Sequence, residues 1–370
     1  MELKNQKLLE DWNKEIIDDS KQNKKVVLKA DLTQQVMTIK LQKNRYNWNV
    51  LLILTLLLVL TISMIFITIC IFPAALRLHQ SAILGLQVGW RLQENKIPEI
   101  LLAGVGLSLG SYIIQQVTQN RLADTSIMGV STVNIVVMVI IYTAGVGTTL
   151  VFQKIEPWVL MFSSTLVAIL IFGLSYKKRQ NISKKFVLAG IIINFLFVGF
   201  GNTFFNVGKA NESIFLVSPY LDGQLPIPSL TSYQFYCALA IIVFAIIWLL
   251  IIAKPLFVAN SNYLIAKSLG NNPTNLYFQS IVISALLTAG AFILVGNITF
   301  LGIATGNMAF FFFRKKITYG SISTILFGIF FMLFSFFIGN NVIANSYDPS
   351  SLIIPLIVAP IFIFLALKRK

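Results

Sequence analysis

The sequence predicts an all-α protein that crosses a membrane about ten times, with both ends of the chain in the cytoplasm. Three observations predict this class: 56% of the 370 residues are hydrophobic, only 12% are charged, and the mean hydropathy is +0.79. Soluble domains carry roughly 25% charged residues, so this chain cannot cover its surface in water. Its long apolar runs are typical of membrane helices, whereas a barrel would show short alternating segments.

Ten apolar segments follow one another, and several reach the ~20 residues that a helix needs to cross the bilayer core. They occupy about residues 49–72, 99–117, 127–145, 157–175, 186–206, 234–253, 275–296, 298–312, 318–338 and 351–367. The eighth is too short to cross alone, so we expect a partial helix that other helices shield. Residues 48–370 are therefore expected to form one ten-helix membrane domain.

Lysine and arginine residues orient the chain, because cytoplasmic loops carry an excess of them. With the N-terminus inside, only five of the 29 fall outside, namely Arg77, Arg91, Lys96, Lys154 and Lys209. The bias recurs at nearly every inside turn, which predicts a multi-pass protein of the cell (plasma or inner) membrane. This topology explains the net charge of +15 better than nucleic-acid binding does.

Residues 1–47 form a cytoplasmic tail ahead of this domain. One helical face of the tail carries Leu8, Leu9, Trp12, Ile16 and Ile17. That spacing predicts an amphipathic helix on the membrane or on a partner, but the mixed charge fits a solvated tail equally well. The first apolar run begins near Asn49, too late for a cleavable signal peptide.

Several kinds of chemistry are missing from the sequence. There is no G-x-x-x-x-G-K-[ST] loop for ATP, and the single histidine, His79, excludes a histidine-based metal site. Cys70 and Cys237 lie in apolar runs and are expected to be small buried residues. The apolar segments contain almost no charged residues, unlike those of ion-driven transporters. We therefore expect no catalytic residues, cofactor or metal, and any transport would draw its energy from another subunit.

Three stretches, taken in order, resemble the membrane permeases of ABC importers for iron-siderophore complexes, haem and vitamin B12. They are Lys96–Ser131, Val187–Asn194 (VLAGIIIN) and Ala266–Phe300, with a weaker match at Tyr220–Gly223. The first looks like the family's R-x-P-R, glycine-rich helix and N-P-L-A-D-P turn, with matching positions at Pro98, Gly104, Gln116, Asn120, Leu122, Ala123, Asp124 and Gly129. The resemblance covers residues 50–370 and implies a ten-helix fold similar to the vitamin B12 importer permease.

The departures from the family's pattern identify a divergent member. Arg121 and Thr125 replace the two prolines of the turn, and Glu99 replaces the second arginine of R-x-P-R. Asn307 and its neighbour Gly306 stand where the family has histidine and proline, and Phe310 stands in place of an arginine. We expect the 119–131 turn to be structural, with Asp124 capping the helix that comes after it.

The resemblance implies a permease that pairs with a second, identical or homologous permease subunit in the lipid bilayer. It also implies two ABC ATPase subunits on the cytoplasmic side, an external substrate-binding protein, and an iron chelate or cobalamin-like substrate. The expected ATPase-coupling residues, within Asn262–Asn275, are Ala266, Lys267, Leu269, Gly270 and Asn271. An ordinary cytoplasmic loop is the alternative interpretation of that segment.

The external loop Asn206–Tyr233 is expected to dock the binding protein through Glu212 and Asp222, although both acids would also suit a solvated loop. Two other functional classes stay open at this point. One is a secondary carrier or channel that needs no ATPase, and the other is a non-transport membrane scaffold. Co-purification with a P-loop ATPase distinguishes the importer from both.

Overall fold

The computed structural model describes residues 51–68, 96–175, 183–208, 216–223, 230–313, 317–341 and 353–360. The chain divides into two units, Met1–Thr55 and Leu56–Lys370. Of the first unit only residues 51–55 are described, so the predicted tail and the boundary at 47/48 lie outside the described residues. The second unit contains the helical bundle.

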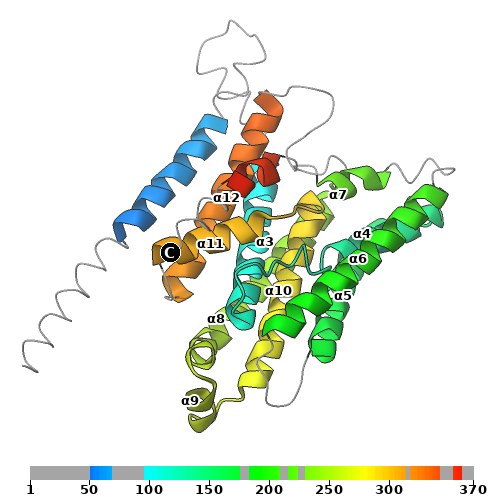
Figure 1. Cartoon of the computed structure of the whole chain (residues 1–370). Helices are drawn as coiled ribbons and strands as arrows, with labels where there is room; N and C mark the ends of the chain where they lie inside the picture. The colour runs from blue at the N-terminus through cyan, green and yellow to red at the C-terminus, as the bar shows by residue number, and fades with distance from the viewer. Residues whose placement is uncertain are drawn as a thin grey trace, which may run out of the picture. The chain divides into compact units, whose positions relative to one another are not determined.

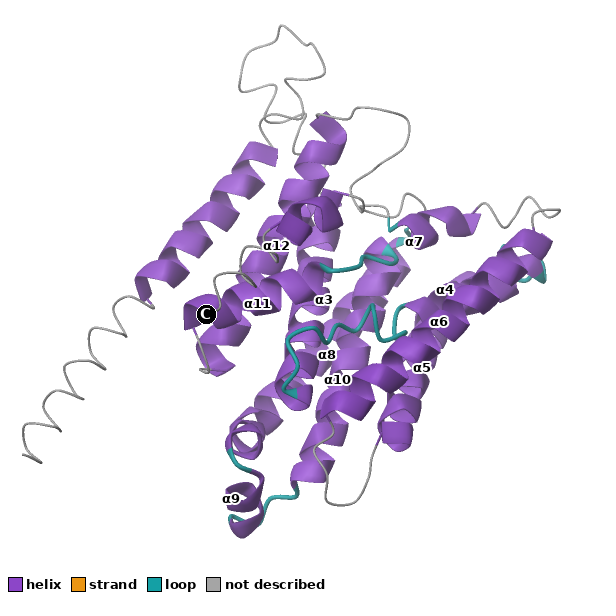
Figure 2. Cartoon of the chain, viewed as in Figure 1, coloured by secondary structure: helices purple, strands orange, loops and turns teal. Residues whose placement is uncertain are grey.

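All the regular structure in the described ranges is helical, with no strand (Figure 2). In chain order the labelled helices of Figure 1 are α3 (Lys96–Thr118), α4 (Thr132–Thr143), α5 (Leu150–Ser175), α6 (Ser183–Gly208), α7 (Ser218–Asp222), α8 (Ser232–Ser261), α9 (Tyr263–Ser268), α10 (Pro273–Val295), α11 (Leu301–Phe313) and α12 (Ile317–Asn341). Two further helices cover Leu51–Thr68 and residues 353–360.

Every predicted apolar segment coincides, over at least part of its length, with a described helix. Seven described helices are long and apolar enough to cross a membrane: Leu51–Thr68 and the long parts of α3, α5, α6, α8, α10 and α12. Two further apolar helices, α4 and α11, are shorter. The short α11 agrees with the expectation for the eighth segment, and the count of ten crossings stays a prediction.

The centre of the bundle is α10, which packs against α3, α8 and α5. Almost all of its membrane-crossing residues are buried, and α3 is the next most buried of the candidate spans. In contrast, most residues of α6 and α8 are at least partly exposed, as expected for helices that face lipid. Helices that are apolar on all sides in this way belong either in a core or in a bilayer.

Glycines allow the central helices to approach closely. A Cβ atom added at Gly106 of α3 would lie 2.7 Å from the carbonyl oxygen of Leu287 in α10. At Gly104 an added Cβ would lie 3.1 Å from the carbonyl oxygen of Gly328 in α12. Ser284 of α10 donates a hydrogen bond to the carbonyl oxygen of Gly110, at 2.7 Å. Small residues and interhelical hydrogen bonds are what holds helices together where the hydrophobic effect is weak.

Helix boundaries correct one expectation. The helix α5 begins at Leu150 rather than near residue 157, so it includes Lys154 and Glu156. The helices α3 and α8 likewise include Glu99 and Lys254. Charged side chains therefore lie within the ends of the membrane helices. Apolar composition marks the middle of a membrane helix, not the turns by which it enters water.

Candidate functional site: the short helix α9 and the motifs around it

The short helix α9 lies between the end of α8 and the start of α10, at the opposite end of these helices from α7 (Figure 1). Asn262 begins it, because its side-chain oxygen accepts hydrogen bonds from the backbone of Leu264 at 2.9 Å and Ile265 at 3.2 Å. The Tyr277 hydroxyl of α10 donates to the carbonyl oxygen of Ala259 in α8, at 2.9 Å. The helix α9 itself packs against both α8 and α10.

The outward face of α9 is apolar. Tyr263, Leu264, Ile265 and Leu269 are 45%, 73%, 53% and 64% exposed. They sit beside Lys267, which is also exposed, on a segment too short to span a membrane. We call Tyr263, Leu264, Ile265 and Leu269 the α9 patch. Apolar patches on exposed segments mark interaction sites more often than chance positions do.

The residues predicted for ATPase coupling divide into two sets. Leu269, Lys267 and Gly270 are exposed, whereas Ala266 is fully buried. Its position on the inner face of α9 explains the burial, because a methyl group permits close packing against the bundle. Gly270 ends the helix with φ +79, and no atom lies within 4 Å of a Cβ built there. Asn271 is half-buried.

The three stretches that carry the family resemblance pack on one another. The first is joined to the third because Gly106 and Gly110 lie against α10. The first meets the second where Gly129, at φ +84, lies against Asn194 of α6. An added Cβ at Gly190 would likewise lie 2.9 Å from Cβ of Met128. The motifs are distant in sequence, but parts of the second and third stretches each contact the first.

The turn between α3 and α4 is tied to α3 by Asp124, which is 2% exposed. The Ser111 hydroxyl donates to its Oδ1 at 2.5 Å, and the Ser126 backbone approaches the same oxygen at 3.5 Å. Burial raises the pKa of the Asp124 carboxyl, and these hydrogen bonds oppose the shift. Because α4 begins only at Thr132, Asp124 does not cap it, which corrects that expectation.

The remaining motif residues of the first stretch are placed as follows. Asn120 accepts a hydrogen bond from the Leu122 backbone at 3.0 Å, while Leu122 is exposed and Ala123 is buried. Gln116 is half-buried. Its neighbour Gln115, which the sequence interpretation missed, donates to the carbonyl oxygen of Gly302 in α11 at 3.0 Å. Pro98 lies in the first turn of α3.

Three departures from the family pattern meet at this same turn. The guanidinium carbon of Arg121 lies 3.3 Å from the centroid of the Phe310 ring in α11. The Asn307 side chain donates to the carbonyl oxygen of Arg121 at 3.0 Å. The substituted residues therefore interact with one another, and they join the turn to α11.

At the opposite end of the bundle, a buried carboxylate joins three helices. Glu156 of α5, 1% exposed, accepts hydrogen bonds from the Tyr220 hydroxyl of α7 at 2.9 Å and from the Gln234 side chain of α8 at 3.0 Å. The Tyr220 ring stacks on Phe292 of α10, with centroids 5.9 Å apart. Burial, followed by the charge of Glu156, raises the pKa of the Tyr220 hydroxyl, so that it stays protonated and donates.

Neither residue predicted to dock a binding protein is described in full. Glu212 lies outside the described residues, and of Asp222 only the backbone, at the end of α7, is described. Cys70 and His79 also lie outside the described residues, whereas Cys237 is buried as expected. No group of three or more His, Cys, Asp or Glu in the described part of the chain is arranged to hold a metal ion.

Long apolar helices packed around a centre of small residues are typical of a multi-pass membrane protein. The FecCD transport family matches residues 50–368, and the chain belongs to this family. The prediction of a permease of this class is thereby confirmed, and the chain is a transport protein rather than an enzyme.

Named relatives agree with this assignment. The chain is 26% identical over 293 residues to the iron(3+)-hydroxamate import system permease protein FhuG of Bacillus subtilis (strain 168), covering 75% of this chain and 84% of that protein. It is 25% identical over 289 residues to the Fe(3+)-citrate import system permease protein YfmE of the same organism, covering 74% and 81%. A solved structure described as an inward-facing conformation of a metal-chelate type ABC transporter has a TM-score of 0.67 at 19% identity, covering 86% of this chain and 99% of that chain. This last likeness shows the fold.

Proposed function

We propose that the chain is the permease subunit of an ATP-driven importer for iron chelates. It would form the translocation path with a second, identical or homologous, permease subunit. Two ATPase subunits would bind in the cytoplasm, and an external binding protein would deliver the chelate. The proposed topology has ten crossings of the plasma or inner membrane and both termini in the cytoplasm.

The observation that carries this proposal is the α9 patch. It exposes four large apolar side chains on a short helix held by α8 and α10. A protein without a partner at this point would expose these groups to water at a cost of about 25 cal/mol for every Å². Because α10 is central to the bundle, a force applied at α9 reaches α3, α5 and α8 directly. That mechanical position suits an ATPase whose closure moves the permease between two states.

The proposed orientation rests on charge. The α9 end carries Lys254 and Lys267, and the chain between α5 and α6 adds Lys177, Lys178 and Arg179. The α7 end carries fewer basic residues, Lys96 and Lys154 at the starts of α3 and α5. Under the positive-inside bias the α9 end faces the cytoplasm and α7 faces outward.

The proposed substrate class is an iron(III) chelate. It rests on the names of the two Bacillus relatives, which are hydroxamate and citrate import permeases. The described region has no metal-binding group of its own, which fits a path that recognises a whole chelate rather than a bare ion. Haem and cobalamin, which the broader resemblance allows, serve as the competing substrates in the test.

The test is reconstitution. The chain is co-expressed with the ATPase subunits of its importer, purified, and placed in proteoliposomes with the binding protein. We expect ATP-dependent uptake of ferric hydroxamate or ferric citrate, and no uptake of haem or cobalamin. Flux that needs no ATPase would instead support a secondary carrier. Absence of both an associated ATPase and flux would support a scaffold.

A pair of substitutions isolates the α9 patch. Leu264→Ser together with Leu269→Ser removes exposed apolar area without opening a cavity, so the permease should stay folded and lose the ATPase on purification. Leu264→Met keeps the apolar surface and should retain the ATPase. Equal recovery of ATPase with both variants would contradict the assignment of α9.

A further inference from the structure

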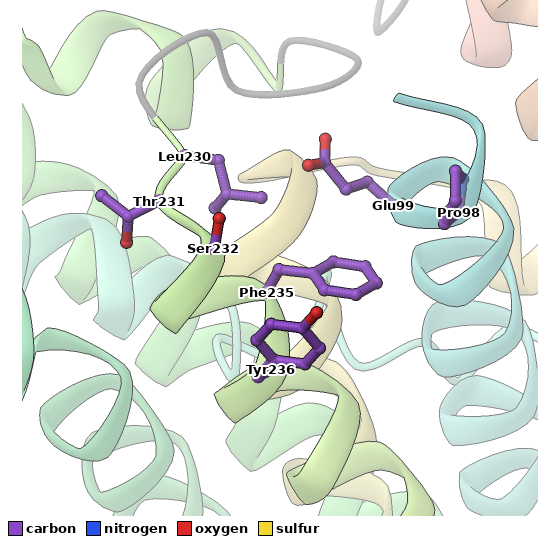
Figure 3. Close-up of a pocket in the computed structure, with 7 residues that line it drawn as sticks. All are labelled: Pro98, Glu99, Leu230, Thr231, Ser232, Phe235 and Tyr236. Carbon is purple, nitrogen blue, oxygen red and sulfur yellow. The ribbon is translucent and has the colours of Figure 1, made fainter. Parts of the chain in front are cut away.

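A small hollow lies between the first turns of α3 and α8, at the α7 end of the bundle. It measures about 180 Å³ and is lined by Pro98 and Glu99 of α3 and by Leu230, Thr231, Ser232, Phe235 and Tyr236 at the start of α8. Figure 3 shows the Glu99 carboxyl group reaching from α3 toward the α8 side, above the rings of Phe235 and Tyr236. The hollow thus has an acidic wall, hydroxyl groups opposite, and an aromatic floor.

Glu99 is the one acidic residue in the lining of this hollow. It is 9% exposed, and none of the described residues gives it a hydrogen bond. Lys96, one turn before it on α3, is exposed. The Thr231 hydroxyl is engaged within its own capping box, where it donates to the Gln234 side chain at 2.9 Å. The Glu99 carboxyl group therefore faces the hollow with hydrogen-bond acceptors that a cationic group entering the hollow can use.

The lining selects the kind of cation. A divalent metal ion takes six to eight oxygen ligands or an octahedral set, which one carboxylate and a few hydroxyls do not provide. The rings of Phe235 and Tyr236, in an edge-to-face pair with centroids 5.6 Å apart, instead favour an organic cation. An ammonium or guanidinium group can bind a carboxylate and the face of an aromatic ring at the same time.

The volume of the hollow indicates whether that cation is a whole small molecule or the end of a protein side chain. Sites for whole small-molecule ligands measure about 300–1,000 Å³, so a hollow of about 180 Å³ holds the end of a side chain and not a chelate. Tyr236 is 65% exposed, so the floor is accessible from outside the bundle. We infer that this hollow receives a lysine or arginine side chain of the external binding protein. This inference rests on the proposed function, which places the α7 end outside.

The first experiment needs no partner protein. The full chain in nanodiscs is titrated with N-acetyl-arginine amide, and binding is followed by saturation-transfer NMR, with the uncharged isostere N-acetyl-citrulline amide as the control ligand. We expect the arginine probe to bind and the citrulline probe to fail. Glu99→Gln should weaken arginine binding about tenfold or more, because a hydrogen bond to a charged group is lost. Lys96→Gln, an exposed change on the same turn, should not weaken it.

Two results of that titration would overturn the inference: equal binding of both probes, or equal arginine binding by wild type and Glu99→Gln. Ser232→Leu provides a second variant if Glu99→Gln does not fold, since it fills the hollow from α8 without removing the acid. It should also abolish arginine binding.

The second experiment identifies the source of the side chain. The affinity of the purified binding protein is measured for wild type, Glu99→Gln and Glu99→Lys. We expect loss with both variants, and recovery with Glu99→Lys when one basic residue of the binding protein is changed to glutamate. Equal affinity for all three chains would sink the inference and leave the proposed importer intact. Failure of the binding protein and the ATPase to bind even the wild type would instead reject the proposed function.

Discussion

The Tyr220 hydroxyl lies 2.9 Å from a carboxylate oxygen of Glu156, and this one contact connects α7 to the start of α5. The second carboxylate oxygen accepts from Gln234 of α8, and the Tyr220 carbonyl accepts from the Asn297 backbone after α10, at 2.9 Å. A five-residue helix that would not be stable alone is therefore held by the ends of three long helices. Breaking its central hydrogen bond should free that end of the bundle.

Tyr220→Phe should lower the stability of the permease. The change leaves a buried Glu156 oxygen without a donor, which costs about 1–3 kcal/mol. Tyr233→Phe is the matched control, because its hydroxyl also takes part in a hydrogen bond, from Trp158, but at an exposed position. Thermal unfolding in detergent should show a lower midpoint for Tyr220→Phe only. Identical midpoints for the two variants would argue that the Glu156 contact contributes nothing.

Gly106→Ala should weaken the packing of α3 on α10. The added methyl group would lie 2.7 Å from the Leu287 carbonyl oxygen, and overpacking of this kind costs about 1–3 kcal/mol. Gly173→Ala makes the same chemical change in α5, where no atom lies within 4 Å. Unfolding in detergent should separate the two variants, with Gly173→Ala close to wild type. A stable Gly106→Ala protein would mean that α3 and α10 are not in contact at this level.

Arg121 and Phe310 should be energetically coupled. A double-mutant cycle with Arg121→Gln and Phe310→Leu, measured by chemical or thermal unfolding, is expected to give about 0.5–1 kcal/mol, the range for a cation over an aromatic ring at a partly exposed site. The effect of Phe310→Leu should shrink once Arg121 is replaced. Strictly additive effects of the two substitutions on the free energy of unfolding would show that Arg121 and Phe310 do not stabilise the protein by interacting.

Gly270→Leu should abolish ATP-coupled uptake while leaving the protein inserted in the membrane. Within the chain the new side chain would meet open space, so its bulk acts on a partner and not on the bundle. Gly145→Leu is the control, because Gly145 has φ +76 against +79 for Gly270 and also faces open space. Both variants carry the backbone strain of a left-handed residue, about 1–2 kcal/mol. Equal loss of uptake in both would attribute the effect to strain alone.

Much of the helix pattern could be predicted from sequence, because apolar runs long enough for a bilayer are a strong local signal. The short α11 was also predictable, since its run ended too early to cross. The helix ends were not predictable to the turn. Lys154 and Glu156 suggested a loop by composition, yet α5 contains both, because a helix continues wherever its backbone hydrogen bonds can be made.

The candidate site was less accessible to sequence reasoning. The segment holding α9 and its Gly270 stood out through a resemblance, but burial of Ala266 depends on which face of a six-residue helix meets the bundle. The contact between Glu156 and Tyr220 joins residues 64 positions apart, so no local pattern marks it. Gln115 was missed beside Gln116 because one position along a helix changes the face by about 100°.

The central position of α10 also determines when the helix bundle can be completed during synthesis. Its three main partners, α3, α5 and α8, all precede it in the chain. When the ribosome has released the chain as far as Asn272, those three helices are in the membrane without the element that packs them together. The small-residue face of α3 therefore gains its main partner only when α10 is added. Premature termination before Pro273 leaves a set of helices that lacks its centre.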